Sequence, residues 1–68
     1  MADTLIPPAL ARAGRIYFSI REAEAEAWHT FRLTPPGPDE RRWCRKAKRL
    51  GALARWWQRE RIRLATRG

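Results

Sequence analysis

The stretch that decides the fold runs from Asp39 to Thr66 and reads DERRWCRKAKRLGALARWWQRERIRLAT. Its residues separate into two faces when they are placed at about 100° per residue, the rotation of an α-helix. The first turn contains Asp39 and Glu40, whose carboxylates suit the positive end of a helix dipole. We therefore expect one long basic helix over residues 39–66, about 42 Å long at about 1.5 Å per residue.

One face of this expected helix is apolar. Its residues recur at spacings of three and four, as in a heptad seam, and Arg61 interrupts the series. We expect this stripe to pack against another helix of the same chain, with self-association as the alternative. The stripe consists of Trp43, Ala47, Leu50, Ala54, Trp57 and Leu64, with Leu53 and Ala65 at its margins.

The opposite face is cationic. Like charges four residues apart destabilise an isolated helix by about 0.2 to 0.5 kcal/mol per pair, so a bound anion should relieve the repulsion. Carboxylates at Glu22, Glu24 and Glu26 could do this in part from within the chain, although they are fewer than the cations. The cationic residues are Arg41, Arg45, Lys48, Arg49, Arg55, Arg59, Arg63 and Arg67.

Trp56 lies in the middle of this cationic face, where a helix that was merely soluble would carry a polar residue. An indole among guanidinium groups is typical of single-stranded nucleic-acid sites, where a stacked base contributes about 1 to 3 kcal/mol. Trp and Arg also dominate the energetics of protein interfaces, and Trp56 could instead pack on the N-terminal segment. The candidate binding residues are Arg41, Arg45, Lys48, Arg49, Arg55, Trp56, Arg59 and Arg63.

Gly51 stands inside the expected helix, where glycine costs about 1 kcal/mol relative to alanine. Either it lets a neighbouring element approach closely, or the helix breaks there. If the helix breaks, Ala47-Lys48-Arg49-Leu50-Gly51 resembles the Ala-x-x-x-Gly core of helix-turn-helix DNA-binding proteins. That resemblance implies a groove-reading helix over residues 52–66 with Arg55, Arg59 and Arg63 facing DNA, but no Ser or Thr cap follows the glycine.

The first half of the chain has weaker signals. Residues 7–14 indicate a short helical turn that starts at proline and stops at Gly14, and residues 15–18 suit a short extended segment. Ser19-Ile20-Arg21-Glu22 matches a capping box, which predicts a helix over residues 20–33. That helix has an apolar stripe of its own and ends at the proline-rich joint 34–38. The stripe consists of Ile20, Ala23, Ala27 and Phe31.

The fold class that we predict is mainly α, a single small domain over residues 1–68 in which helix 20–33 and helix 39–66 form an α-hairpin. The alternative is an α+β fold in which residues 15–33 form a β-hairpin packed on the long helix. Ile16, Phe18 and Ile20 alternate well enough for strands, but the tight turn would fall on Ala and Glu residues, which favour helix.

Composition limits the function. The net charge is +8, and residues 41–68 carry eleven basic residues against Glu60 alone. A field of that sign attracts polyanions. One cysteine, Cys44, and one histidine, His29, offer too few ligands for a zinc site, and no nucleophile, base or phosphate-loop motif is present. We expect neither an enzyme nor a cofactor.

The segment at the N-terminus lacks the basic start and unbroken apolar run of a signal peptide, and no stretch reaches the roughly 20 apolar residues of a membrane span. We therefore expect a cytoplasmic protein that does not cross a membrane. The first functional hypothesis is binding of DNA or RNA. The second is a small regulator or inhibitor, of the kind that phages or mobile elements encode, that binds an acidic protein surface. A peripheral membrane helix is the third, and a homo-oligomer is compatible with each.

Overall fold

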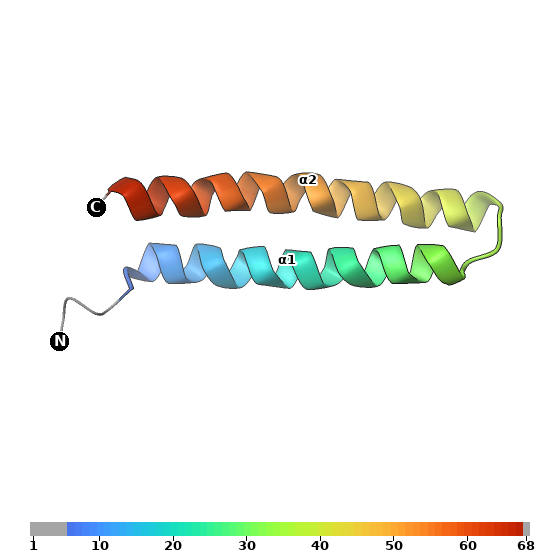
Figure 1. Cartoon of the computed structure of the whole chain (residues 1–68), viewed down its shortest axis with the longest axis horizontal. Helices are drawn as coiled ribbons and strands as arrows, with labels where there is room; N and C mark the ends of the chain where they lie inside the picture. Colours follow the sequence, from blue (N-terminus) through green and yellow to red (C-terminus); the bar gives the residue numbers. More distant parts are fainter. Residues whose placement is uncertain (1–5, 68) are drawn as a thin grey trace.

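The chain is an α-hairpin. A computed structural model describes residues 6–67, with the side chains of residues 6–66, and places them in two antiparallel helices, α1 (Pro8–Leu33) and α2 (Pro38–Arg67). The helices lie side by side in a single layer, and the start of α1 and the end of α2 meet at the open end (Figure 1). The predicted α-hairpin is confirmed. The β-hairpin alternative is wrong, because residues 15–33 are helical.

Helix α1 begins twelve residues earlier than the sequence predicted, at Pro8 rather than Ile20. Pro8 does occupy the first helical position, and the amide of Ala11 donates to the carbonyl of Pro7 at 3.0 Å. The predicted stop at Gly14 and the extended segment 15–18 are wrong, and Ser19 lies inside the helix rather than at a cap. Packing against α2 overrides the local preferences of these residues, since Ile16 and Tyr17 are half-buried in the continuous helix.

The joint between the helices falls where the prolines predicted it. The amide of Thr34 donates to the carbonyl of Phe31 at 3.2 Å, and its hydroxyl donates to the carbonyl of Thr30 at 2.6 Å. Gly37 has φ of +152°, a conformation that favours glycine, and directs the chain into α2. Asp39 and Glu40 lie in the first turn of α2, as expected.

The centre of the hairpin is built from small residues. The buried hydrophobic side chains of the described part are those of Ala13, Ala27, Ala47 and Ala54, and Gly51 is buried beside them. Ala13 and Ala27 are fourteen residues apart and Ala47 and Ala54 are seven apart, so each pair lies on one line of its helix. Small side chains along this line let the two backbones approach closely. The core is therefore thin, and none of the described large side chains is fully buried.

The larger apolar residues flank this line. The predicted stripe of α2 is buried or half-buried, and so is the stripe of α1, which confirms the packing of one on the other. Leu53 and Ala65, predicted at the margins, are exposed. Arg61, which interrupts the stripe in the sequence, is half-buried in the seam.

Gly51 allows a close approach rather than a break. Helix α2 continues through it, so the helix-turn-helix interpretation is wrong. A β-carbon at this position would lie 2.8 Å from a carboxylate oxygen of Glu24. Glycine therefore makes room for the Glu24 side chain of α1, in a helix that alanine would otherwise suit better.

Candidate functional site

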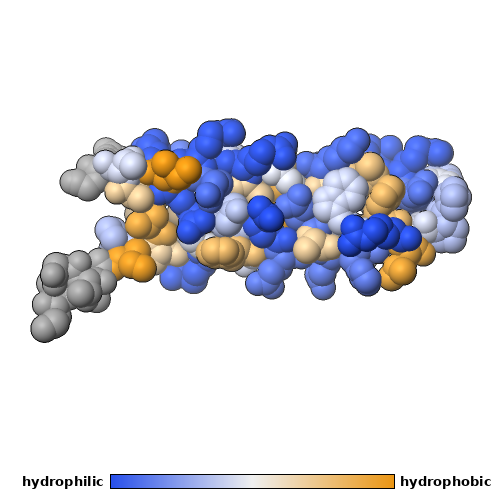
Figure 2. All heavy atoms as spheres, viewed as in Figure 1, coloured by the Kyte–Doolittle hydropathy of each residue, from blue (hydrophilic) through white to orange (hydrophobic). Residues whose placement is uncertain are grey.

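The predicted cationic residues lie on the outside of α2. Hydrophilic atoms cover much of the α2 side of the molecule (Figure 2). Arg67 was also predicted to belong to this face, but its side chain lies outside the described residues. We call the other seven the cationic face. They are all exposed, and they are Arg41, Arg45, Lys48, Arg49, Arg55, Arg59 and Arg63.

Few of these charges are neutralised within the chain. In the part that the structure describes, the ion pairs are Arg21–Glu24 at 3.6 Å and Arg63–Glu60 at 2.6 Å, each within one helix. No ion pair joins α1 to α2 among these residues, so the partial neutralisation that Glu22, Glu24 and Glu26 could supply does not take the form of ion pairs with α2 there.

Arg63 and Glu60 form two hydrogen bonds. The Nε and Nη2 atoms of Arg63 donate to the carboxylate of Glu60 at 3.2 and 2.6 Å. These bonds lower the pKa of Glu60 and raise the pKa of Arg63, because each charged form stabilises the other. The pair is exposed to solvent, so it contributes little to stability.

Trp56 is exposed on the cationic face, with 47% of its surface accessible. It is not isolated. Its ring meets that of Trp57 edge to face, with centroids 5.0 Å apart and an interplanar angle of 84°. Leu53, 45% exposed, lies one turn before it. Together with Arg49 and Ala52, these side chains line a shallow apolar hollow, which we call the indole patch.

The cationic face places arginines on both sides of this indole. Arg49 and Arg63 are each seven residues from Trp56, which puts them on the same side of α2, about 10 Å away in each direction. Arg59 follows Trp56 by three residues and lies about one turn away. The arrangement offers one flat apolar surface between positive charges.

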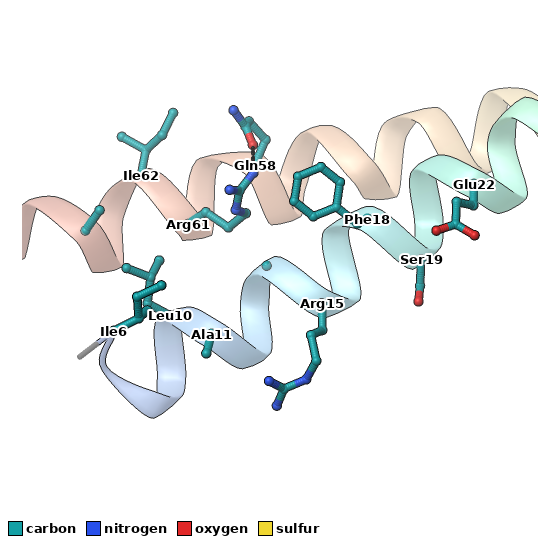
Figure 3. Close-up of a pocket in the computed structure, with 12 residues that line it drawn as sticks. Ile6, Leu10, Ala11, Arg15, Phe18, Ser19, Glu22, Gln58, Arg61 and Ile62 are labelled. Carbon is teal, nitrogen blue, oxygen red and sulfur yellow. Dashed lines mark hydrogen bonds between the residues drawn. The ribbon is translucent and has the colours of Figure 1, made fainter. Parts of the chain in front are cut away.

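A larger hollow lies at the open end of the hairpin. It has a volume of about 850 Å³ and is lined by both helices, with apolar side chains such as Leu10, Phe18 and Ile62 beside polar ones such as Gln58 and Arg61. Hydrophobic atoms gather there in Figure 2, over the start of α1 and the last turns of α2. In Figure 3, Ile6 and Leu10 lie together at the start of α1, and Arg15 and Ser19 point away from α2. Phe18 and Ile62 are both more than half exposed, at 56% and 54%.

Arg61 crosses the seam at this end. Its guanidinium lies 4.9 Å from the ring centroid of Tyr17 and 5.1 Å from that of Phe18, within the range of cation–π contacts. Its Nη1 donates to Gln58 at 2.8 Å (Figure 3). Its Nε is buried without a hydrogen-bond partner among the described residues. Arg61 is therefore a packing residue and does not belong to the cationic face.

The candidate ligands and nucleophiles do not assemble into a site. Cys44 is a free, half-buried thiol, and His29 is exposed beside Trp43 and Lys46. Within residues 6–66, no three His, Cys, Asp or Glu side chains gather as metal ligands would. The arrangement of these groups gives no support to metal binding at this surface.

The structure thus brings Trp56 together with Arg49, Arg59 and Arg63 on one surface, and spreads the other four predicted residues along the length of α2. Sequence reasoning missed Leu53 and Trp57 as parts of the indole patch, having assigned both to the packed stripe. Their spacing of three and one residues from Trp56 was the available signal. It also missed the hollow at the open end, because residues 6–18 were predicted to form other elements.

A comparison with known proteins finds no family model, curated protein or solved structure that matches the chain. Neither helix, over the described residues, contains a segment long and apolar enough to cross a bilayer.

Proposed function

We propose that the chain is a non-enzymatic nucleic-acid-binding protein that holds phosphates on the cationic face of α2. The observation that carries this proposal is the exposure of seven cations on one helix, of which only Arg63 has an ion pair among the described residues. Uncompensated cations repel one another along a helix. A polyanion relieves this repulsion and releases counterions as it binds, which makes the interaction favourable at low salt.

Trp56 favours single strands over duplexes. A base can stack on its exposed ring while Arg49 and Arg63, about 10 Å away on either side, contact the flanking phosphates. The bases of a duplex are already stacked on one another and present only their edges. We therefore expect single-stranded DNA or RNA to gain from Trp56 and duplexes to gain only from the arginines.

A cytoplasmic location belongs to the same proposal. The chain has one cysteine, so it needs no oxidising compartment for an intramolecular disulfide. Nucleic acid is also available there.

The indole patch favours a second candidate, which is binding to an acidic surface of a larger protein. Two tryptophans and an arginine in one shallow hollow are the residue types that dominate protein hot spots. A small regulator or inhibitor, such as phages and mobile elements encode, would use the patch as its anchor and the surrounding arginines for orientation.

A titration separates the two candidates. The purified protein is titrated into labelled single-stranded and double-stranded DNA and RNA at low and at physiological salt, with fluorescence anisotropy as the readout. For single strands we expect the logarithm of affinity to fall with that of salt concentration by about 0.7 per phosphate contacted. Trp56→Ala should weaken single-strand binding by about 5-fold to 150-fold, the equivalent of about 1 to 3 kcal/mol, and should hardly change duplex binding.

A pair of double variants controls for charge alone. Arg45→Gln with Arg59→Gln removes two members of the cationic face and should reduce the salt slope by about 1.4. Arg15→Gln with Arg32→Gln removes the same charge from exposed positions of α1 and should leave the slope nearly unchanged. If both double variants lower the salt slope equally, binding depends on the net charge of the chain and not on the cationic face. Absence of binding to every nucleic acid at low salt would refute the proposal and favour the protein partner.

A further inference from the structure

One edge of α2 carries a charge pattern that is complementary to itself. Lys46, Leu53 and Glu60 are spaced by seven residues and therefore lie on one line of the helix, in the order cation, apolar residue, anion. Lys46 and Leu53 are exposed, and Glu60 is half-buried beside Arg63. Leu53, at the centre of the line, is also close to the midpoint of α2.

We propose that this edge pairs with the same edge of a second copy, antiparallel and across a twofold axis at Leu53. A twofold axis brings residues that are equally far from Leu53, on opposite sides of it, next to each other. Lys46 and Glu60 are each seven residues from Leu53, about 10 Å along the helix. Lys46 of each chain therefore meets Glu60 of the other, and this contact occurs twice.

The neighbouring residues agree with the same axis. Arg49 precedes Leu53 by four residues and Trp56 follows it by three, and at about 100° per residue both lie on the same side of the Leu53 line, so the guanidinium of Arg49 in one chain faces the indole of Trp56 in the other. Leu50 and Trp57 lie together on the other side of the Leu53 line, before and after the axis, and bring apolar surface of the two chains together. Lys46 and Arg49 thus face a carboxylate and an aromatic ring, although the chain carries a net charge of +8.

The α1 side of the same face leaves room for a second copy. Ala23 and Glu26 of α1 line one hollow with Trp43 and Lys46 of α2, so these four residues share a side of the hairpin. Ala23 is small and allows a close approach. The hairpin is one layer thick (Figure 1), whereas stable domains pack at least two layers. Stacking two hairpins on this face makes a four-helix bundle.

The available area suits a dimer. The face is about 40 Å long, from the length of the helices, and the hairpin is 18 Å across. Covering it removes about 700 Å² from each chain and about 1,400 Å² in total, which lies in the range of stable interfaces. A twofold interface must be complementary to itself, and the order Lys46, Leu53, Glu60 meets that condition, which favours a second copy over an unrelated partner.

The dimer does not depend on nucleic acid. The dimer covers Arg49 and part of Trp56, whereas Arg41, Arg45, Lys48, Arg55 and Arg59 lie on other sides of α2 and remain outside the contact. Self-association is measured without nucleic acid, so its failure is distinguished from a failure of nucleic-acid binding.

Charge exchange tests the axis. Sedimentation equilibrium of the full chain without nucleic acid should give a dimer. Lys46→Glu and Glu60→Lys should each raise the dissociation constant by about tenfold, since two attractive pairs become repulsive. The double variant K46E/E60K restores both pairs with reversed sign and should return the dissociation constant to within about threefold of the original. Circular dichroism checks that each variant keeps its helices.

A disulfide tests the geometry independently. In a Cys44→Ser background, Leu53→Cys places one thiol on the axis next to its copy, so mild oxidation should yield covalent dimers. Ile62→Cys in the same background is the matched control, because Ile62 is also an exposed apolar residue of α2 but lies away from the axis. Its thiol should not cross-link. A monomer at all concentrations, failure of the double charge variant to restore the dimer, or equal cross-linking at both positions would overturn the proposal.

Discussion

Replacing the buried Ala47 by leucine should destabilise the hairpin more than replacing Ala52 by leucine, because Ala52 is exposed on the same helix. Ala47 is fully buried, with 0% of its surface accessible, on the line where the helix backbones approach. A leucine adds three carbon atoms at a fully buried point on the line of small residues, where the close approach of the two backbones leaves no space for them. The helices must separate locally, and other contacts of the thin core are weakened with them.

Overpacking of this kind costs about 1 to 3 kcal/mol, and the rigidity of the surroundings places Ala47 at the upper end. A chain of this length is stabilised by only about 3 to 10 kcal/mol in total. Each kcal/mol lowers the melting temperature of so small a domain by about 4 to 8 °C. We therefore expect Ala47→Leu to melt about 10 to 20 °C below the unsubstituted chain.

The assay is thermal unfolding followed by circular dichroism, with all variants at one protein concentration because self-association shifts apparent stability. Ala52→Leu is the matched control. Ala52 is exposed on the same helix, and leucine and alanine differ little in helix propensity, so its melting temperature should hardly move. If Ala47→Leu melts at or above the temperature of Ala52→Leu, the alanine seam is not the contact that holds the helices together.

Three further substitutions test individual contacts. Gly51→Ala should raise the free energy of unfolding by about 0.5 kcal/mol, since a helix gain of about 1 kcal/mol exceeds the cost of displacing the Glu24 carboxylate; a loss in urea unfolding would mean that Glu24 cannot move. The lowered pKa of Glu60 implies that its contact with Arg63 stabilises the chain above pH 4.5, the ordinary carboxyl value, and loses this effect as the pH falls through the lowered pKa. Because the pair is exposed, Glu60→Gln should flatten the acid side of the stability profile only slightly, and a profile that becomes steeper would contradict the assignment. Arg61→Met should stay within about 1 kcal/mol of the original chain in urea unfolding, because losing two cation–π contacts is offset by removing a buried Nε without a partner. A loss of more than about 2 kcal/mol would show that the ring contacts dominate.

Local sequence signals located α2 to within one residue at each end. Amphipathic periodicity is a property of the helix itself, and acidic residues and prolines at its start act within one turn. For the same reason the joint at residues 34–38 and the exposure of Trp56 and the cationic face could be predicted without knowing the fold. The N-terminal half of α1 could not. When only near neighbours are considered, Gly14 favours a break, residues 15–18 favour a strand and Ser19 favours a helix cap. The helix that contains all of them depends on packing against α2.

The binding surface is likewise determined partly by the sequence and partly by the tertiary structure. Its charge can be counted from the sequence, because arginines on the outer side of a helix remain exposed whatever packs on the inner side. Only the tertiary structure decided that Glu22, Glu24 and Glu26 form no ion pairs with those arginines among the residues whose side chains are described, that Gly51 makes room for a carboxylate, and that Arg61 contacts two aromatic rings of α1. Gly14 and Arg61 are 47 residues apart in the chain and neighbours across the seam. Contacts between such distant residues depend on the register of one helix against the other, which the periodicity of either helix alone does not determine.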